Sequence, residues 1–381
     1  MKQIAVIGAS YLQLPLILKA KDMGLVTHVF AWAAGDVGET AADFFYPISI
    51  VEKEKILEEC RRIGIDAVTS IGSDLAMVTV SYVADSLSLP CNSPEAVKRS
   101  TDKHAMRLAF EAHHDPSPRS VLVESIGDIN PSKLNYPVIV KPLDRSGSRG
   151  ITKLTGPKHL EEAIENAKAC GFQKQALIEE FAEGAEYSVE SISWQGKHTI
   201  LAVTEKFTTG SPHFIETGHL EPAGLSEQMM EKVSRTVTHA LDSLGITMGA
   251  GHSEVKIDDR GEIRIIEIGG RMGGDLIGSD LVPLSIGYDF VKAVIDCALG
   301  VPPEPFVLKE QKAAGVRFLF DEEDRAAYAE LCRKHPELLV RDEIGEGNGE
   351  VSDSSSRHGY FLMAGNSREE ILPYLPGRKK E

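Results

Sequence analysis

The stretch 252-HSEVKIDDRGEIRIIEIGGRMGGD-275 places two apolar-rich runs on either side of Asp-Asp-Arg-Gly, which predicts two β-strands joined by a turn. If Arg260 and Gly261 form the turn, Glu254 lies directly opposite Glu267 on one face of the hairpin. Like charges at such a position destabilise a sheet, so a positive group is expected between them. Mg²⁺ suits the position because carboxylates and phosphates hold it. The alternative is a solvated hairpin face that carries two unpaired acids.

Glycines surround Arg271 just beyond the second strand; they are Gly269, Gly270, Gly273 and Gly274. Glycine lets backbone approach a ligand closely, and an arginine fork binds a carboxylate or phosphoryl group through two hydrogen bonds. The pattern predicts a ligand contact at Arg271. The alternative is a glycine-rich loop in which Arg271 pairs with Asp275.

A second ligand loop is expected upstream, where a strand at 138–142 delivers Lys141 and the loop 144–150 follows it. The small residues of this loop include Ser146, Gly147 and Ser148. A lysine followed by free backbone N–H groups can cradle phosphate, although the GxxxxGK[ST] pattern is absent. The alternative is a surface loop with no ligand.

The acidic segment 179–186 follows the next expected strand. Backbone groups at a strand end can contact adenine, and a carboxylate seven residues beyond Glu179, at Glu186, can bind ribose hydroxyls. An ordinary acidic turn has the same composition, and without other signals that interpretation is preferred.

Apolar runs at 4–7, 27–31 and 67–71 alternate with helical patterns and predict a doubly wound parallel sheet of the α/β class. The turn Gly8-Ala9-Ser10 lacks the GxGxxG spacing, which argues against a nicotinamide or flavin enzyme and favours strand-to-helix packing, with a substrate contact as the alternative. Hairpins and helices of α+β character follow. They include strands at 187–194 and 199–205 joined by a turn at Gln195-Gly196, and a helix at 226–244 that ends at Gly245. The expected domains are an N-terminal α/β domain at 1–95, two α+β subdomains at 96–185 and 186–303, and a small C-terminal α+β region at 304–381.

These features, in this order, resemble the ATP-grasp superfamily over about residues 1–300. The resemblance implies an ATP-grasp fold of two α+β subdomains that clamp ATP behind the N-terminal domain. The residues that it assigns to ATP are Lys103, Lys141, Ser146, Gly147, Ser148, Glu179, Glu180, Phe181, Ala182 and Glu186. It assigns Mg²⁺, with Mn²⁺ as an alternative ion, to Glu254 and Glu267.

Glu267-Ile-Gly269-Gly-Arg271 is similar to a subset of the family, the L-amino-acid ligases that make dipeptides. That likeness implies catalytic roles for Arg271, Lys141 and an upstream histidine, for which His219 is preferred over His213 and His252. The family commonly has Asn where this chain has Gly269, so a second metal would have fewer protein ligands or a different one.

The implied activity is that of an ATP-dependent carboxylate–amine ligase that acts through an acyl phosphate and releases ADP and phosphate. Its substrates are then a small carboxylic acid and an amine, with amino acids preferred. Arg271 would hold the acid and the oxyanion that follows, while Lys103 and Lys141 contact the phosphates. The alternatives are a carboxylase or purine-biosynthetic ligase using bicarbonate or a ribonucleotide amine, and a non-catalytic ATP-binding regulator.

Composition limits the partners and the location of the chain. Its 381 residues carry a formal net charge of −16, which argues against a nucleic-acid partner. The sequence has no apolar run long enough to span a bilayer and no recognisable signal peptide, so no membrane partner is expected. The scattered cysteines favour a cytoplasmic setting, and a homodimer is the default assembly.

Overall fold

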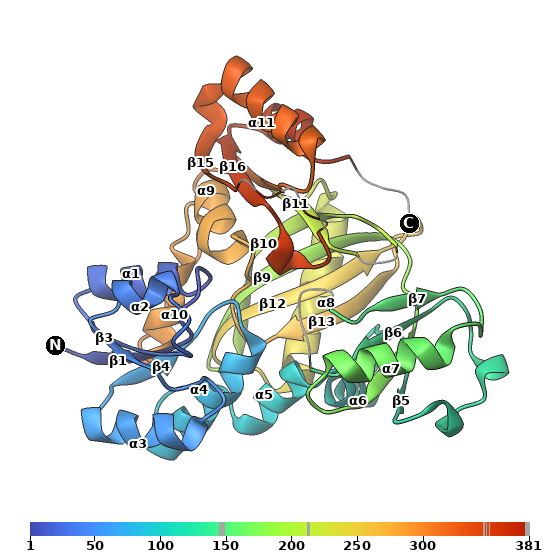
Figure 1. Ribbon diagram of the computed structural model, residues 1–381. Coiled ribbons are helices and arrows are strands. Elements are labelled where there is room, and N and C mark those ends of the chain that lie inside the picture. The colour runs from blue at the N-terminus through green and yellow to red at the C-terminus, as the bar shows by residue number, and fades with distance from the viewer. Residues whose placement is uncertain (145–148, 212–213, 346, 348, 350, 378–381) are drawn as a thin grey trace.

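The computed structural model describes residues 1–144, 149–211, 214–345, 347, 349 and 351–377, and the predicted loop residues Ser146, Gly147 and Ser148, with His213, lie outside these ranges. Three β-sheets organise the chain (Figure 1). The N-terminal α/β domain and the small sheet lie beside one large sheet, which the C-terminal strands extend (Figure 1). Within the described ranges, no helix has the length and apolarity to cross a membrane.

The N-terminal sheet is parallel, as predicted, with the strand order β3-β2-β1-β4. Its strands are β1 (Gln3–Ile7), β2 (Val26–Phe30), β3 (Phe44–Tyr46) and β4 (Ala67–Thr69). Its helices are α1 (Leu14–Asp22), α2 (Val37–Ala41), α3 (Lys53–Ile63) and α4 (Asp74–Leu87). Ile4 and Val6 pack into one apolar cluster and Ala5 and Ile7 into another, so both faces of the sheet are covered.

The turn after β1 serves strand-to-helix packing, as predicted. The buried Gln13 side chain accepts a hydrogen bond from the Ser10 amide at 3.1 Å and donates one to Ile71 O at 2.6 Å. Gly8 has φ +106° and a Cβ there would lie 2.8 Å from Gln13 Oε1, so this position requires glycine.

The small sheet is antiparallel, with the order β5-β8-β6-β7, and α7 packs on one face of it. Its strands are β5 (Ser120–Val123), β6 (Val138–Pro142), β7 (Thr152–Leu154) and β8 (Ala176–Glu180). The helices that connect or cover it are α5 (Pro94–Thr101), α6 (Lys103–His113) and α7 (Leu160–Cys170). Short 3₁₀ turns lie at Ile126–Asp128 and Pro131–Lys133.

The large sheet has eight strands in the order β13-β12-β9-β10-β11-β14-β16-β15. In chain order they are β9 (Ala185–Trp194), β10 (Lys197–Thr208), β11 (Glu216–Glu221), β12 (Gly249–Ile257), β13 (Ile263–Gly269), β14 (Ala313–Phe318), β15 (Leu339–Ile344) and β16 (Gly359–Gly365). The remaining helices are α8 (Glu227–Leu244), α9 (Val282–Ile286), α10 (Phe290–Ala298), α11 (Glu322–Lys334) and α12 (Arg368–Ile371), with a π-helical turn at Ile277–Leu281 and 3₁₀ turns at Pro336–Leu338, Ser354–Ser356 and Leu372–Tyr374.

The two faces of the large sheet differ in chemistry, and this difference positions the site. Val189, Val203 and Val255 point to one face, where they pack with α8 in an apolar cluster. Because side chains alternate along a strand, neighbours such as Glu190 and Glu254 point to the opposite face. Charged groups are therefore gathered on the face turned away from α8.

Candidate active site

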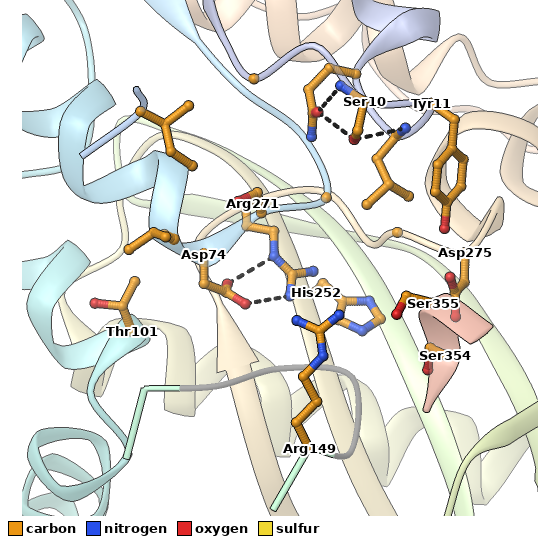
Figure 2. A pocket seen from close by; sticks show the side chains of 18 of the residues that line it. Ser10, Tyr11, Asp74, Thr101, Arg149, His252, Arg271, Asp275, Ser354 and Ser355 are labelled. Carbon is orange, nitrogen blue, oxygen red and sulfur yellow. Dashed lines mark hydrogen bonds and ion pairs between the residues drawn. The ribbon is translucent and has the colours of Figure 1, made fainter. Parts of the chain in front are cut away.

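A cleft of about 1910 Å³ opens between the N-terminal domain, the polar face of the large sheet and residues 343–345 and 354–360. Of the predicted site residues, it brings together Lys103, His219, Glu254, Glu267 and Arg271. The candidate His252 lines it too, and further charged lining residues include Asp74, Arg149, Lys206, Glu216, Asp275 and Arg357. Figure 2 shows side chains from distant segments converging on this space.

Glu254 and Glu267 lie directly opposite each other in the β12–β13 pair, as predicted, and both line the cleft. Each acid has a lysine beside it: Lys103 Nζ is 3.0 Å from Glu267 Oε1, and Lys206 Nζ is 2.7 Å from Glu254 Oε1. Burial alone would raise the pKa of Glu254, but Lys206 and His252 hold it well below its usual value. Without a metal, lysine ammonium groups thus neutralise both carboxylates, and oxygen ligands of this kind fit a magnesium ion.

The predicted uniform register of this hairpin is wrong, although the pairing of the two acids is right. Ile257 lies opposite Ile263, and the register shifts between Glu254 and Val255. Ile266 is the extra residue of this β-bulge. Its carbonyl oxygen accepts a hydrogen bond of 2.6 Å from Arg107 Nη2, so the bulge is held in place from α6.

Lys206, which sequence analysis missed, is the most heavily paired lysine of the site. Its Nζ lies 2.7 Å from Glu186 Oε1 and 3.6 Å from Glu216 Oε1, besides its contact with Glu254. Burial opposes its charge, but Glu186 and Glu254 raise its pKa well above the usual value. A signal existed in the sequence: Lys206 directly follows the predicted strand 199–205 and continues its alternation.

The residues predicted to contact adenine and ribose do not line this cleft, and neither does Lys141, which was predicted to contact phosphate. Lys141 Nζ is 2.5 Å from Glu179 Oε2, and Arg107 Nε is 2.8 Å from Glu179 Oε1, so both oxygens of this buried carboxylate are engaged. Burial, which outweighs the opposing effect of Glu179, lowers the pKa of Lys141.

The backbone after Glu179 is partly engaged as well. The amides of Glu180 and Phe181 donate to Arg119 O and Pro137 O, both at 3.0 Å. The described residues offer no hydrogen-bond partner to the Ala182 amide, so it is the amide of this segment that is available to donate to adenine.

Arg271 is held by Asp74 from the first turn of α4, and not by Asp275 as the alternative had it. Its Nε and Nη2 each donate to one Asp74 carboxylate oxygen at 2.8 Å (Figure 2). Burial alone would raise the pKa of Asp74, but Arg271 lowers it. This buried pair joins the N-terminal domain to the glycine-rich loop across the cleft.

The same pair accounts for the glycine at residue 269, where the resemblance pointed to asparagine. A Cβ at Gly269 would lie 2.8 Å from Asp74 Oδ1 and 3.2 Å from Arg271 Cζ. An asparagine side chain has no space here. Among the described residues, no group of three or more acidic, histidine or cysteine side chains is placed to hold a metal.

Gly269→Ala is expected to displace the Asp74 carboxylate and to lower the free energy of unfolding by about 1–3 kcal/mol, because the new methyl group overpacks a filled site. Denaturant unfolding measures the change. The control is Gly156→Ala, where a Cβ would meet no atom within 4 Å. Equal stability of the two variants would show that residue 269 is not crowded.

The two described histidines of the prediction differ in charge. Burial lowers the pKa of His219 to about 3, so its ring is neutral, and neither ring nitrogen has a partner within the described ranges. The His252 ring is bonded through Nδ1 to Glu190, which raises its pKa to about 9 against the effect of burial. His219 therefore offers a free neutral ring and His252 an imidazolium, 3.5 Å from Glu254 Oε1.

Arg357 from the C-terminal region closes one end of the cleft, and no sequence pattern pointed to it. Its guanidinium donates to Asp275 through two hydrogen bonds of 2.8 and 3.0 Å and lies 3.7 Å from the Phe318 ring centre. Asp275 and Leu276 have φ values of +49° and +66°, an unfavoured conformation for residues with a side chain. The bidentate contact with Arg357 stabilises this strained turn.

Glu221 is a fully buried carboxyl beneath the cleft floor, on the same face as His219. It accepts hydrogen bonds from Thr204 Oγ1 at 2.7 Å and from Ser285 Oγ. Burial, reinforced by Glu190, raises its pKa from 4.5 to about 7, so the folded protein binds its proton more tightly than the unfolded chain does.

The contribution of Glu221 to stability should therefore fall as pH rises from 4.5 to 7, because the unfolded chain loses this proton first. Glu221→Gln removes the titration and keeps the shape. The difference in unfolding free energy between the variant and the parent is expected to grow by about 3 kcal/mol in favour of the variant across this range. Denaturant unfolding at intervals of pH measures it, and a constant difference would contradict the buried neutral carboxyl.

A parallel α/β domain followed by two α+β sheets around a charged cleft is the architecture of ATP-grasp proteins. Residues 134–280 match the family model described as an ATP-grasp domain, so the chain has an ATP-grasp domain within an ATP-grasp fold. The fold is shared with the crystal structure of an L-amino acid ligase from Bacillus licheniformis, at a TM-score of 0.82, 22% identity and coverage of 98% of this chain and 96% of that one.

Curated relatives match over part of their length. An alanine–anticapsin ligase of Bacillus subtilis (strain 168) is 26% identical over 63% of this chain and 58% of its own length. Carnosine synthase 1 of Homo sapiens is 23% identical over 79% of this chain and 40% of its own length. The matches thus span about half the length of these relatives.

Proposed function

We propose that this chain is an ADP-forming ligase that joins a carboxylic acid to an amine at the expense of ATP, through an acyl phosphate. The observation that carries the proposal is the opposed pair Glu254 and Glu267 in the cleft, each neutralised by a buried lysine. A pair of carboxylates held ready for cations is what transfer of a phosphoryl group to an acid requires. When bound, Mg²⁺, or Mn²⁺ in its place, would neutralise the nucleotide phosphates at these two acids.

The residues of the chain have separate parts in this proposal. Lys103 and Lys141 contact the phosphates, the Ala182 amide meets the adenine, and Glu186 meets the ribose. Asp74 holds the plane of the Arg271 guanidinium, and Met272 O accepts a hydrogen bond from its Nη1, so the N–H groups that remain are the proposed donors to the acyl oxygen. The amine nitrogen then attacks the acyl carbon, phosphate leaves with the C–O electron pair, and the nitrogen loses a proton.

Amino acids are the proposed acid and amine. The support comes from the relatives, which are named as an alanine–anticapsin ligase and a carnosine synthase, and from the fold shared with an L-amino acid ligase. The neutral His219 ring is proposed to donate to the acyl oxygen. The domain ranges, the cytoplasmic location and the homodimer stay predictions.

The test is release of ADP and phosphate by the purified chain with Mg²⁺, over a panel of amino-acid pairs, bicarbonate and ribonucleotide amines. Release that depends on amino acids is expected. Release that depends on bicarbonate or a ribonucleotide amine would replace the proposal by a carboxylase or purine-type ligase. Nucleotide binding without release under any condition would replace it by a regulator.

A further inference from the structure

Large apolar side chains gather on the N-terminal side of the cleft, where they are open to solvent. Trp32 is 72% exposed, Val51 57%, Val78 39% and Leu75 37%, and all of them line the cleft. Single exposed apolar residues are ordinary, but several in one concavity mark a binding surface. This surface is continuous with the cleft that holds Glu254, Glu267 and Arg271.

Helix α4 fixes where this apolar surface begins. Its first residue is Asp74, which holds Arg271, and Leu75 follows directly. Val78 is four residues beyond Asp74, so both side chains lie on one face of the helix. The rise of a helix places Val78 about 6 Å farther along the axis. Because Arg271 is proposed to hold the acyl group, the amine nitrogen that attacks the acyl carbon must lie beside it. An amine in that place meets apolar side chains about the length of a leucine or phenylalanine side chain away.

The position of the surface also agrees with the topology of the N-terminal sheet. Open parallel sheets bind ligands beyond the carboxyl ends of their strands, at the point where the strand order reverses. Trp32 follows β2, and Gly72 to Asp74 follow β4, so the apolar surface lies at that end of the sheet. The lysines on this side are Lys53, whose Nζ lies 4.6 Å from the Tyr82 ring centre, and Lys98 on α5.

We propose that the amine substrate is an amino acid with a large apolar side chain, of the size of leucine, methionine or phenylalanine, which packs against Leu75, Val78 and Trp32. The inference rests on the proposed ligase function and adds the class of its amine substrate. A small or charged side chain on the amine would leave these apolar side chains exposed to water. Removal of an apolar side chain of this size from water favours binding about 10- to 100-fold.

The first experiment measures amine-dependent ADP release with leucine, phenylalanine, glycine and aspartate as the varied amine. The parent chain is expected to have a KM at least about 10-fold lower for leucine and phenylalanine than for glycine. Val78→Asp should raise the KM for the two apolar amines about 10- to 100-fold and leave the KM for glycine and ATP within about 2-fold. The control is Leu18→Asp on α1, a leucine that is 52% exposed and does not line the cleft, and it should change neither constant.

A second readout does not require turnover. The chain has two tryptophans, so in a Trp194→Phe variant the exposed Trp32 is the one source of tryptophan fluorescence. Its fluorescence should shift to shorter wavelength when leucine binds with Mg²⁺ and a non-hydrolysable ATP analogue, and glycine should cause no shift.

The outcomes separate the two proposals. Amino-acid-dependent release with equal KM for leucine and glycine, or an unchanged preference in Val78→Asp, overturns the apolar subsite and leaves the ligase. Release that depends on a ribonucleotide amine or bicarbonate overturns both. A Trp32 shift together with loss of preference in Val78→Asp, in a variant whose melting temperature matches that of Leu18→Asp, supports both.

Discussion

Glu267→Gln is expected to lower amine-dependent ADP release by about a thousand-fold, because a carboxylate that binds the metal contributes several kcal/mol to phosphoryl transfer. Glutamine keeps the size and removes the charge. Lys103, now beside a neutral amide, loses its partner at 3.0 Å. Raising the Mg²⁺ concentration should restore part of the rate, since the lost charge weakens metal binding before it changes the chemistry.

The matched control for this variant is Glu262→Gln, in the turn of the same hairpin. Its side chain is 60% exposed and 3.7 Å from Lys232, so its loss should leave the rate within about 2-fold. Steady-state ADP release at several Mg²⁺ concentrations, with circular dichroism to check the fold, makes the measurement. Equal rates for the two variants would remove Glu267 from the mechanism.

Lys206→Met is expected to destabilise the metal-free protein by about 3–5 kcal/mol, because it leaves carboxylates buried without their cation. Lys206 is 3% exposed and pairs with both Glu186 and Glu254 at 2.7 Å. Methionine fills similar space, so packing changes little. Addition of Mg²⁺ should return part of the stability, because a bound divalent cation replaces the missing charge at Glu254.

Thermal unfolding with and without Mg²⁺ measures both effects. The control is Lys232→Met, which removes a lysine paired with Glu262 at the surface and should change stability by at most about 1 kcal/mol with no response to Mg²⁺. If Lys206→Met and Lys232→Met melted alike, the buried charge network would not be the source of stability proposed here.

The local pattern of the sequence was enough to predict the elements of the fold. The two-residue turn at Gln195-Gly196 is present, with φ values of +51° and +77°, and α8 ends at Gly245 with φ +75°, as its sequence indicated. Alternation of apolar and polar residues along the hairpin placed Glu254 opposite Glu267, because that pairing depends on nearby residues. Such features arise from short-range chemistry.

The contacts that complete the site could not be predicted in this way. Arg271 and Asp74 are 197 residues apart, and Arg357 and Asp275 are 82 apart. The alternation of apolar and polar residues predicts neither pair, because each pair depends on how distant parts of the chain pack against each other. The bulge at Ile266 was missed for the related reason that the Arg107 side chain that holds it comes from α6.

The continuity of the large sheet limits which part of the chain can move during turnover. Strand β11, which bears His219, pairs with β14, and β14 pairs with β16. Main-chain hydrogen bonds therefore join the C-terminal strands to β11. The C-terminal strands cannot move away from β11 to admit nucleotide without breaking these hydrogen bonds. Removal of the C-terminal strands would leave the edge of β11 unpaired, and an unpaired edge strand promotes aggregation. Among the described strands, neither the small sheet nor the N-terminal sheet shares a ladder with the large one, so movement of either would break no sheet hydrogen bonds with it.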